Sequence, residues 1–201
     1  MPLAFNVDIA SSSDMKNLTP LVEDLKGHHQ EIYDDINELS ADKGYDSSEN
    51  NSELYDDHNI KPVIDKRELW KEKKHETLFP NRYDVFCYDE AGRVYCSCPS
   101  GKRGEDELRE LAFVGFEKDR YTLKYRCPAA AFGFNCSGRV ECEELAQSGV
   151  GDFGRTIRVP IETDRRIFTP IARPTGKWTK AYNLRTSVER VNGRIDQVLG
   201  F

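Results

Sequence analysis

The sequence predicts an α/β protein whose core is interrupted by a β-rich segment that carries all six cysteines. Strand-like and helix-like apolar patterns alternate near the N-terminus, short β-like runs fill residues 83–159, and an amphipathic helix is expected over 177–198. We therefore expect an N-terminal core part at 1–75, a cysteine-containing β insertion at 76–160, and a basic connector with the final core helix at 161–201.

The N-terminal part is expected to alternate strands and helices. Residues 3–9 alternate apolar and polar side chains, which is typical of a half-buried strand. Residues 15–27 carry apolar side chains at helical spacing, and Gly27 is suited to a helix end. A short strand at 36–41, a helix that opens at Ser47 or Ser48 and runs to about 55, and a strand at 60–65 follow. This order favours some parallel strand pairing.

The final helix is expected to bury one apolar stripe beside a polar row. The stripe residues recur at three- or four-residue spacing: Leu184, Val188, Val191, Ile195 and Val198. The polar row lies roughly 80–160° around the helix from that stripe. Its members are Tyr182, Arg185, Glu189, Asn192 and Asp196. Glu189 is therefore expected at the margin of a buried surface. It would serve there either as a ligand or catalytic group or as part of a salt-bridged helix surface.

The charge is unevenly distributed along the chain. The formal net charge is −6, with acids in excess over residues 1–60 and bases in excess over 154–201. This asymmetry suggests either contact of the C-terminal quarter with a polyanion or an intramolecular match of the two surfaces. No apolar run approaches the roughly 18 residues that a membrane span needs, so no membrane partner is expected. With no secretion signal, the expected location is the cytoplasm.

The cysteines lie between positions 87 and 142. Without a secretion signal, reduced thiols or a metal site are favoured over disulfides. Four thiolates from a set of five would suit a structural zinc ion, with ordinary thiols as the alternative. That set is Cys96, Cys98, Cys127, Cys136 and Cys142.

Two carboxylates stand out as a candidate catalytic pair. Asp42 follows a predicted strand, in a loop that Gly44 makes compact, and Glu189 lies on the polar row of the final helix. An α/β sheet with a packed helix would bring them together as an all-oxygen site suited to Mg²⁺ or Mn²⁺. Such sites support in-line displacement at phosphodiesters.

Residues 41–47, ADKGYDS, and 182–196, YNLRTSVERVNGRID, together resemble the insertion-sequence DDE transposases. In that family the final helix carries Tyr, two residues, Arg, three residues, Glu, six residues and Lys. Tyr182, Arg185 and Glu189 match this pattern, whereas Asp196 stands where the family has Lys. The resemblance implies an RNase H-like fold with Asp42 and Glu189 as the second and third acidic metal ligands. It also implies that Tyr182 and Arg185 beside them contact DNA or organise the site.

The resemblance also implies where DNA would be bound. Lys43 and Arg190 adjoin the two acids and are expected to contact DNA phosphates, unless they are solvated surface charges. Lys177 and Lys180 belong to the basic segment that would position the DNA backbone.

The chain departs from the family at its start, where the strand with the first acid is expected to be missing. Asp8 and Asp14 are the nearest acids, and capping suffices to explain Asp14.

The expected function is therefore that of a transposase fragment that cleaves and joins DNA strands with Mg²⁺ or Mn²⁺. Its partners would be transposon-end and target DNA, its location the bacterial cytoplasm and nucleoid, and a homo-oligomer is a further candidate assembly. The alternatives are a catalytically inactive DNA-binding remnant and a zinc-stabilised interaction module.

Overall fold

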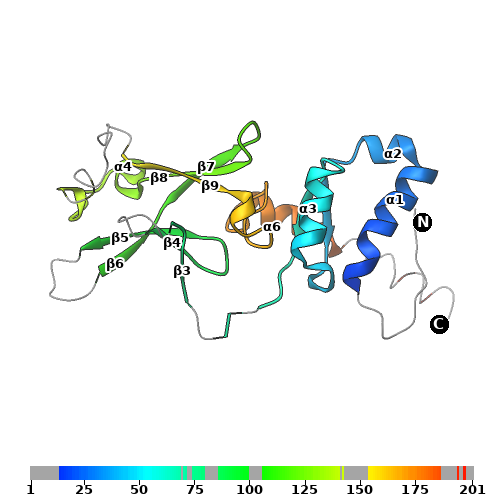
Figure 1. Ribbon diagram of the computed structural model, residues 1–201, viewed down its shortest axis with the longest axis horizontal. Coiled ribbons are helices and arrows are strands. Elements are labelled where there is room, and N and C mark those ends of the chain that lie inside the picture. The colour runs from blue at the N-terminus through cyan, green and yellow to red at the C-terminus, as the bar shows by residue number, and fades with distance from the viewer. Residues whose placement is uncertain are drawn as a thin grey trace. The chain divides into compact units, whose positions relative to one another are not determined.

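The computed structural model describes residues 14–68, 70–71, 74–79, 86–99, 106–140, 142, 154–186, 194 and 197. The chain divides into two compact units, and Figure 1 follows it through both. Unit 1 comprises Met1–Arg67 and Asp164–Phe201, and unit 2 comprises Glu68–Thr163. The α/β class is confirmed, while the strand expected at 3–9 lies outside the described residues.

Unit 1 holds a two-stranded parallel sheet and its helices. The elements are η1 (Asp14–Asn17), α1 (Leu18–His28), α2 (Gln30–Asp34), β1 (Glu38–Ala41), η2 (Lys43–Tyr45), α3 (Ser48–Asp56), β2 (Lys61–Ile64) and α6 (Gly176–Asn183). Ser47 opens α3 as expected, because its side-chain oxygen accepts a hydrogen bond from the Asn50 backbone N–H at 3.0 Å. The expected strands at 36–41 and 60–65 are present as β1 and β2.

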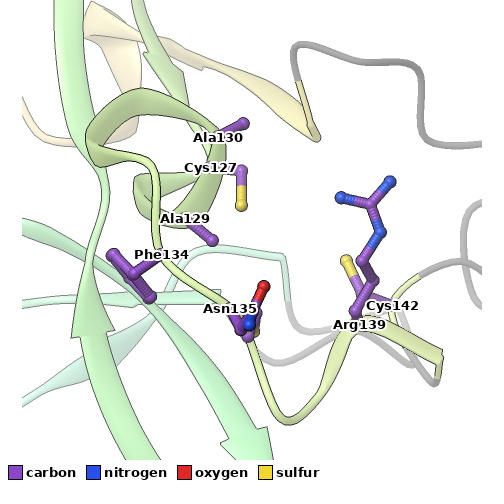
Figure 2. Close-up of a pocket in the computed structure, with 8 residues that line it drawn as sticks. Cys127, Ala129, Ala130, Phe134, Asn135, Arg139 and Cys142 are labelled. Atoms are coloured by element: carbon purple, nitrogen blue, oxygen red, sulfur yellow. The ribbon is translucent and has the colours of Figure 1, made fainter.

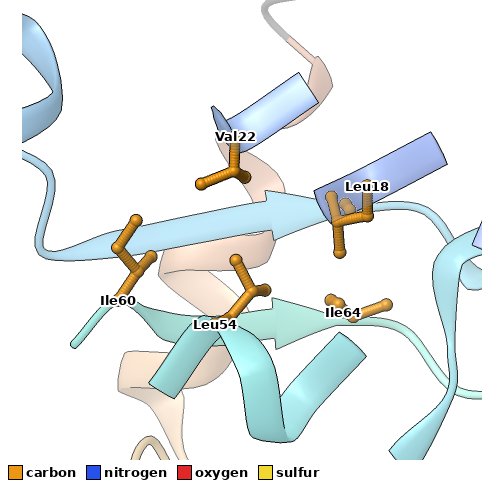
Figure 3. Packing of buried hydrophobic residues seen from close by; sticks show 6 residues of the cluster. Leu18, Val22, Leu54, Ile60 and Ile64 are labelled. Atoms are coloured by element: carbon orange, nitrogen blue, oxygen red, sulfur yellow. The ribbon is translucent and has the colours of Figure 1, made fainter. Parts of the chain in front are cut away.

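One face of the β1–β2 sheet is covered by α1 and α3. Leu18 and Val22 of α1 and Leu54 of α3 form a buried cluster with Ile60 and Ile64 around β2 (Figure 3). Burying each such side chain stabilises the fold by about 1.5–3 kcal/mol. The apolar side chains of α1 thus face the sheet, as the amphipathic pattern of this helix indicates.

The opposite face of the sheet is covered by α6. Side chains alternate along a strand, so Val63 points away from Ile64 and packs with Ala181 of α6 and Ile171. The Ser40 hydroxyl of β1 donates a hydrogen bond of 3.0 Å to the Ala181 carbonyl oxygen. In Figure 3, α6 passes behind the two strands.

The buried face of the final helix differs from the expected stripe. Leu184 is 62% exposed, whereas Ala181 is buried and Trp178 and Tyr182 pack against the same cluster. Two aromatic rings one helical turn apart cover more apolar surface than one leucine, and they decide which face turns inward. α6 ends at Asn183, and Val188, Val191, Ile195 and Val198 lie outside the described residues.

Unit 2 is mainly antiparallel β structure. One sheet has the order β3-β4-β5-β6 and the other the order β7-β8-β9. The elements are β3 (Glu76–Thr77), β4 (Phe86–Tyr88), β5 (Val94–Pro99), β6 (Asp106–Glu110), β7 (Ala112–Glu117), β8 (Thr122–Arg126), α4 (Pro128–Phe132), β9 (Thr156–Pro160) and η3 (Ile161–Thr163).

A buried ion pair holds the loop after β1 in unit 1. Asp46 is buried, and its Oδ2 accepts hydrogen bonds from the Arg166 guanidinium and from the Arg67 backbone N–H. Next to Arg166 in the sequence, Arg165 makes a bidentate pair with Asp56, at 3.2 and 3.0 Å. The Asp56 side chain is 38% exposed, whereas that of Asp46 is fully buried. These two aspartate–arginine pairs allow a matched comparison.

We expect Asp46→Ala to lower the free energy of unfolding by about 3 kcal/mol, because it leaves the Arg166 charge without its buried partner. Asp56→Ala, which removes the same group from the more exposed pair, should cost no more than about 1 kcal/mol. Urea unfolding of both variants measures the difference, and equal losses would contradict the special role of Asp46.

Candidate functional site

Asp42 is positioned by the end of β1. It caps η2, and its Oδ1 accepts a hydrogen bond of 2.6 Å from the Gly44 backbone N–H. Its Oδ2 lies 3.8 Å from Nη1 of Arg185, and its side chain is about half exposed. One carboxylate oxygen is therefore engaged by the loop, while the other faces a guanidinium at the surface.

Asp65 occupies the equivalent position after β2. In the parallel register Ala41 pairs with Ile64, so Asp42 and Asp65 follow the same end of the sheet. The Asp65 backbone N–H donates to the Ala41 carbonyl oxygen at 3.4 Å. The sequence reasoning missed Asp65, although an aspartate directly after a short apolar strand repeats the signal that selected Asp42.

Asp14 lies beside Asp42 as well. A Cβ atom on Gly44 would fall 2.7 Å from Oδ2 of Asp14 and 3.2 Å from Oδ1 of Asp42, so the two carboxylates flank one point of the backbone. Burial raises the pKa of the Tyr45 hydroxyl, and the negative charges of Asp14 and Asp42 raise it further. Asp14 thus takes part in the acidic surroundings of Asp42.

The side chains of α6 and of the turn after it complete the cluster. The Tyr182 hydroxyl lies 3.5 Å from Oδ2 of Asp65, and the Cζ atom of Arg185 lies 5.3 Å from the Tyr182 ring centroid. Burial raises the pKa of Tyr182, Asp65 raises it further, and Arg185 opposes the rise. Tyr182 therefore stays protonated at neutral pH and serves as a hydrogen-bond donor to Asp65.

Tyr182 is held by a stack of rings and cations. Its ring is parallel to that of Trp178, with centroids 4.9 Å apart and an interplanar angle of 13°. The Cζ atom of Arg173 lies 5.5 Å from the Trp178 ring centroid. Arg173 is buried and its Nη1 donates to the Ile64 carbonyl oxygen at 2.7 Å. The stack fixes α6 against the strand end that carries Asp65.

The remaining predicted site residues are placed as follows. Lys43, Lys177 and Lys180 are exposed. Glu189 and Arg190 lie outside the described residues, so the expected approach of Glu189 to Asp42 stays a prediction.

A divalent cation is compatible with the donor chemistry at the sheet end. Asp42 and Asp65 supply the carboxylate oxygens that Mg²⁺ prefers. Among the described residues, however, no group of three His, Cys, Asp or Glu side chains is arranged to hold a metal ion. A cation at Asp42 and Asp65 would therefore draw further ligands from water, substrate or the rest of the chain.

Comparisons of the chain with protein-family models, with curated proteins and with solved structures found no match. Within the described part of the chain, no helix combines the length and the apolar character that crossing a bilayer requires.

We expect Gly44→Ala to lower the free energy of unfolding by about 1 kcal/mol, because its Cβ displaces the Asp14 carboxylate and disturbs the Asp42 cap. Gly27→Ala is the control, because nothing lies within 4 Å of its Cβ position in α1. An alanine there should stabilise the helix by up to about 1 kcal/mol. Chemical denaturation measures both, and a gain at Gly44 would contradict the close approach of Asp14.

Proposed function

We propose that this protein is a DDE-type DNA transposase domain, with an RNase H-like core in unit 1 and a β insertion in unit 2. It would cut and join DNA strands by metal-dependent phosphoryl transfer. The observation that supports this most is the pairing of Asp42 and Asp65 at one end of two parallel strands, with Tyr182 and Arg185 beside them. The resemblance of 41–47 and 182–196 to these transposases adds to it.

The metal-binding role falls on Asp42 and Asp65. A bound Mg²⁺ or Mn²⁺ supplies the positive charge that the phosphate oxygens need during an in-line displacement. Glu189 is the proposed further carboxylate, since it lies on the same C-terminal segment as Tyr182 and Arg185.

Tyr182 is proposed as a positioning residue. Its hydroxyl donates toward Oδ2 of Asp65, and Oδ1 accepts a hydrogen bond of 2.9 Å from the Lys66 backbone N–H. Each oxygen keeps one further lone pair for a cation. The parallel contact with Trp178 restricts rotation of the Tyr182 ring. The Asp65 carboxylate is thereby kept in one orientation, as partners of metal ligands do elsewhere.

Arg185 and the exposed lysines are proposed to bind the DNA backbone. Arg185 lies against Asp42, and a guanidinium in that position binds a phosphate through two parallel hydrogen bonds. Lys43 directly follows Asp42, and Lys177, Lys180 and Arg190 add positive charge in the same C-terminal segment. Such contacts set the position of DNA without reading its sequence.

We expect the purified chain to nick a supercoiled plasmid that carries the DNA flanking its own gene, and to do so only with Mg²⁺ or Mn²⁺. Asp42→Ala, Asp65→Ala and Glu189→Ala should each lower the nicking rate by at least about 100-fold, because each removes a proposed metal ligand. Gel analysis of nicked plasmid against time gives the rates.

Asp57→Ala is the matched control for these variants. Asp57 is exposed and precedes β2, so it lies at the opposite end of that strand from Asp65. It should nick at the wild-type rate. Salt-dependent DNA binding without any metal-dependent nicking would indicate a DNA-binding protein instead, and nicking that survives Asp42→Ala would exclude the proposed site.

We expect Tyr182→Phe to lower the nicking rate by about 10-fold and to raise the Mg²⁺ concentration needed for half-maximal rate, because Asp65 loses its orienting donor. The ring and its stack on Trp178 remain, so DNA binding and the thermal unfolding midpoint should stay unchanged. A Mg²⁺ titration of nicking tests this, and an unaltered Mg²⁺ dependence would speak against the positioning role.

A further inference from the structure

A pocket in unit 2 is lined by three of the six cysteines. Its volume is about 120 Å³, and Cys127, Cys136 and Cys142 contribute to its wall together with Asn135 and Arg139. Figure 2 shows Cys127 at the start of α4 on one side of the pocket, and Arg139 and Cys142 on the other. The three cysteines are nine and six positions apart in the sequence, and the turn that follows α4 brings them to one pocket.

Backbone hydrogen bonds hold Cys127 and Cys142 in place. The Cys127 N–H donates to the Arg155 carbonyl oxygen at 2.7 Å, and the Cys142 N–H donates to the Gly138 carbonyl oxygen at 3.0 Å. Gly154 has a φ of +67°, and a Cβ there would fall 2.6 Å from the Cys127 Cβ. Only glycine allows the chain to approach Cys127 so closely in this conformation.

The thiols affect one another electrostatically. Burial raises the pKa of Cys142, the guanidinium of Arg155 lowers it, and negative charge on Cys127 or Cys136 would raise it again. Three thiolates in this pocket would repel one another, and a cation among them removes that repulsion. Arg139 on the pocket wall and Arg155 beside Cys142 carry positive charge that would stabilise a group of net negative charge in the pocket.

We propose that Cys127, Cys136 and Cys142 bind one Zn²⁺ ion as thiolates, with the fourth tetrahedral position left to water or to a further ligand of the chain. Three thiols release three protons as the ion binds, and the resulting group carries a net charge of −1 that Arg139 and Arg155 offset. Sulfur ligands at about 2.3 Å suit Zn²⁺ and disfavour Mg²⁺. The site is independent of the proposed phosphoryl transfer in unit 1.

Binding requires the three sulfurs to move closer together. The described residues contain no three-ligand group already arranged around a metal position. Cys136 lies in the short segment after Gly133, whose φ of +73° ends α4, and Phe134 in that segment is 42% exposed. A loop with so little burial can follow the ion inward, and folding around the metal is usual for zinc sites.

The described residues set Cys96 apart from the proposed ligands. Cys96 lies on β5 outside the pocket wall, with its Sγ 3.6 Å from the Arg109 carbonyl oxygen. The Cys98 side chain lies outside the described residues, so its expected part in a zinc site stays a prediction. Cys96→Ser is therefore a matched control, because a serine hydroxyl can still donate to that carbonyl oxygen.

The test measures zinc in the full chain, purified under reducing conditions and incubated with excess ZnCl₂ before desalting. We expect one Zn²⁺ per wild-type chain, unchanged in Cys96→Ser, and loss of most of the zinc in Cys127→Ser, Cys136→Ser and Cys142→Ser. Replacement of zinc by Co²⁺ should give a thiolate-to-metal charge-transfer band and the visible bands of tetrahedral cobalt.

The wild-type protein alone can overturn the proposal if a variant fails to fold. Absence of bound zinc while all six thiols react with a thiol reagent would exclude the site, as would a cobalt spectrum without the charge-transfer band. Equal zinc loss in Cys96→Ser would refute the three-thiolate assignment. Acidification should release zinc from the wild-type chain, because the thiolates are protonated again.

Discussion

The parallel pairing of β1 with β2 is the constraint on which the candidate site depends. Because Ala41 pairs with Ile64, both strands end together, and the residue after each is an aspartate. A parallel pair needs cover on both faces. Ile60 and Ile64 meet α1 and α3, whereas Val63 meets α6. The packing that completes the core thus also brings Tyr182 to Asp65.

Three arginines balance the acidic end of this sheet. Arg185 lies against Asp42, Arg166 pairs with the buried Asp46, and the buried Arg173 donates to the Ile64 carbonyl oxygen. Burial lowers the pKa of Arg173, and the nearby Asp46 and Asp65 oppose that shift. Arg166 and Arg173 thereby hold the loop after β1 and the end of β2.

Local signals were readable from the sequence, and contacts distant in sequence were not. Ser47 opens α3 and Asp42 follows β1, because capping and strand ends depend on a few neighbouring residues. The expected burial of Leu184 was wrong, because Tyr182 was assigned to the polar row although its ring packs inward with Trp178. Asp65 was missed although it follows a strand as Asp42 does, because its place beside Asp42 depends on the register of β1 with β2. Its contact with Tyr182 joins positions 117 apart in the sequence. The thiols that line the pocket, likewise, have no spacing that resembles a zinc motif.

The two proposed metal sites differ in their ligands, and this difference decides which ion each one takes. Zn²⁺ binds most mixed sites more tightly than Mg²⁺, so a chain that uses both must separate them by chemistry. Unit 1 presents Asp42 and Asp65, whose oxygens favour Mg²⁺ at cellular concentrations. Unit 2 presents Cys127, Cys136 and Cys142 at one pocket, and their sulfurs would favour Zn²⁺. The sequence of unit 1 contains no cysteine, so unit 1 offers Zn²⁺ no thiolate ligand.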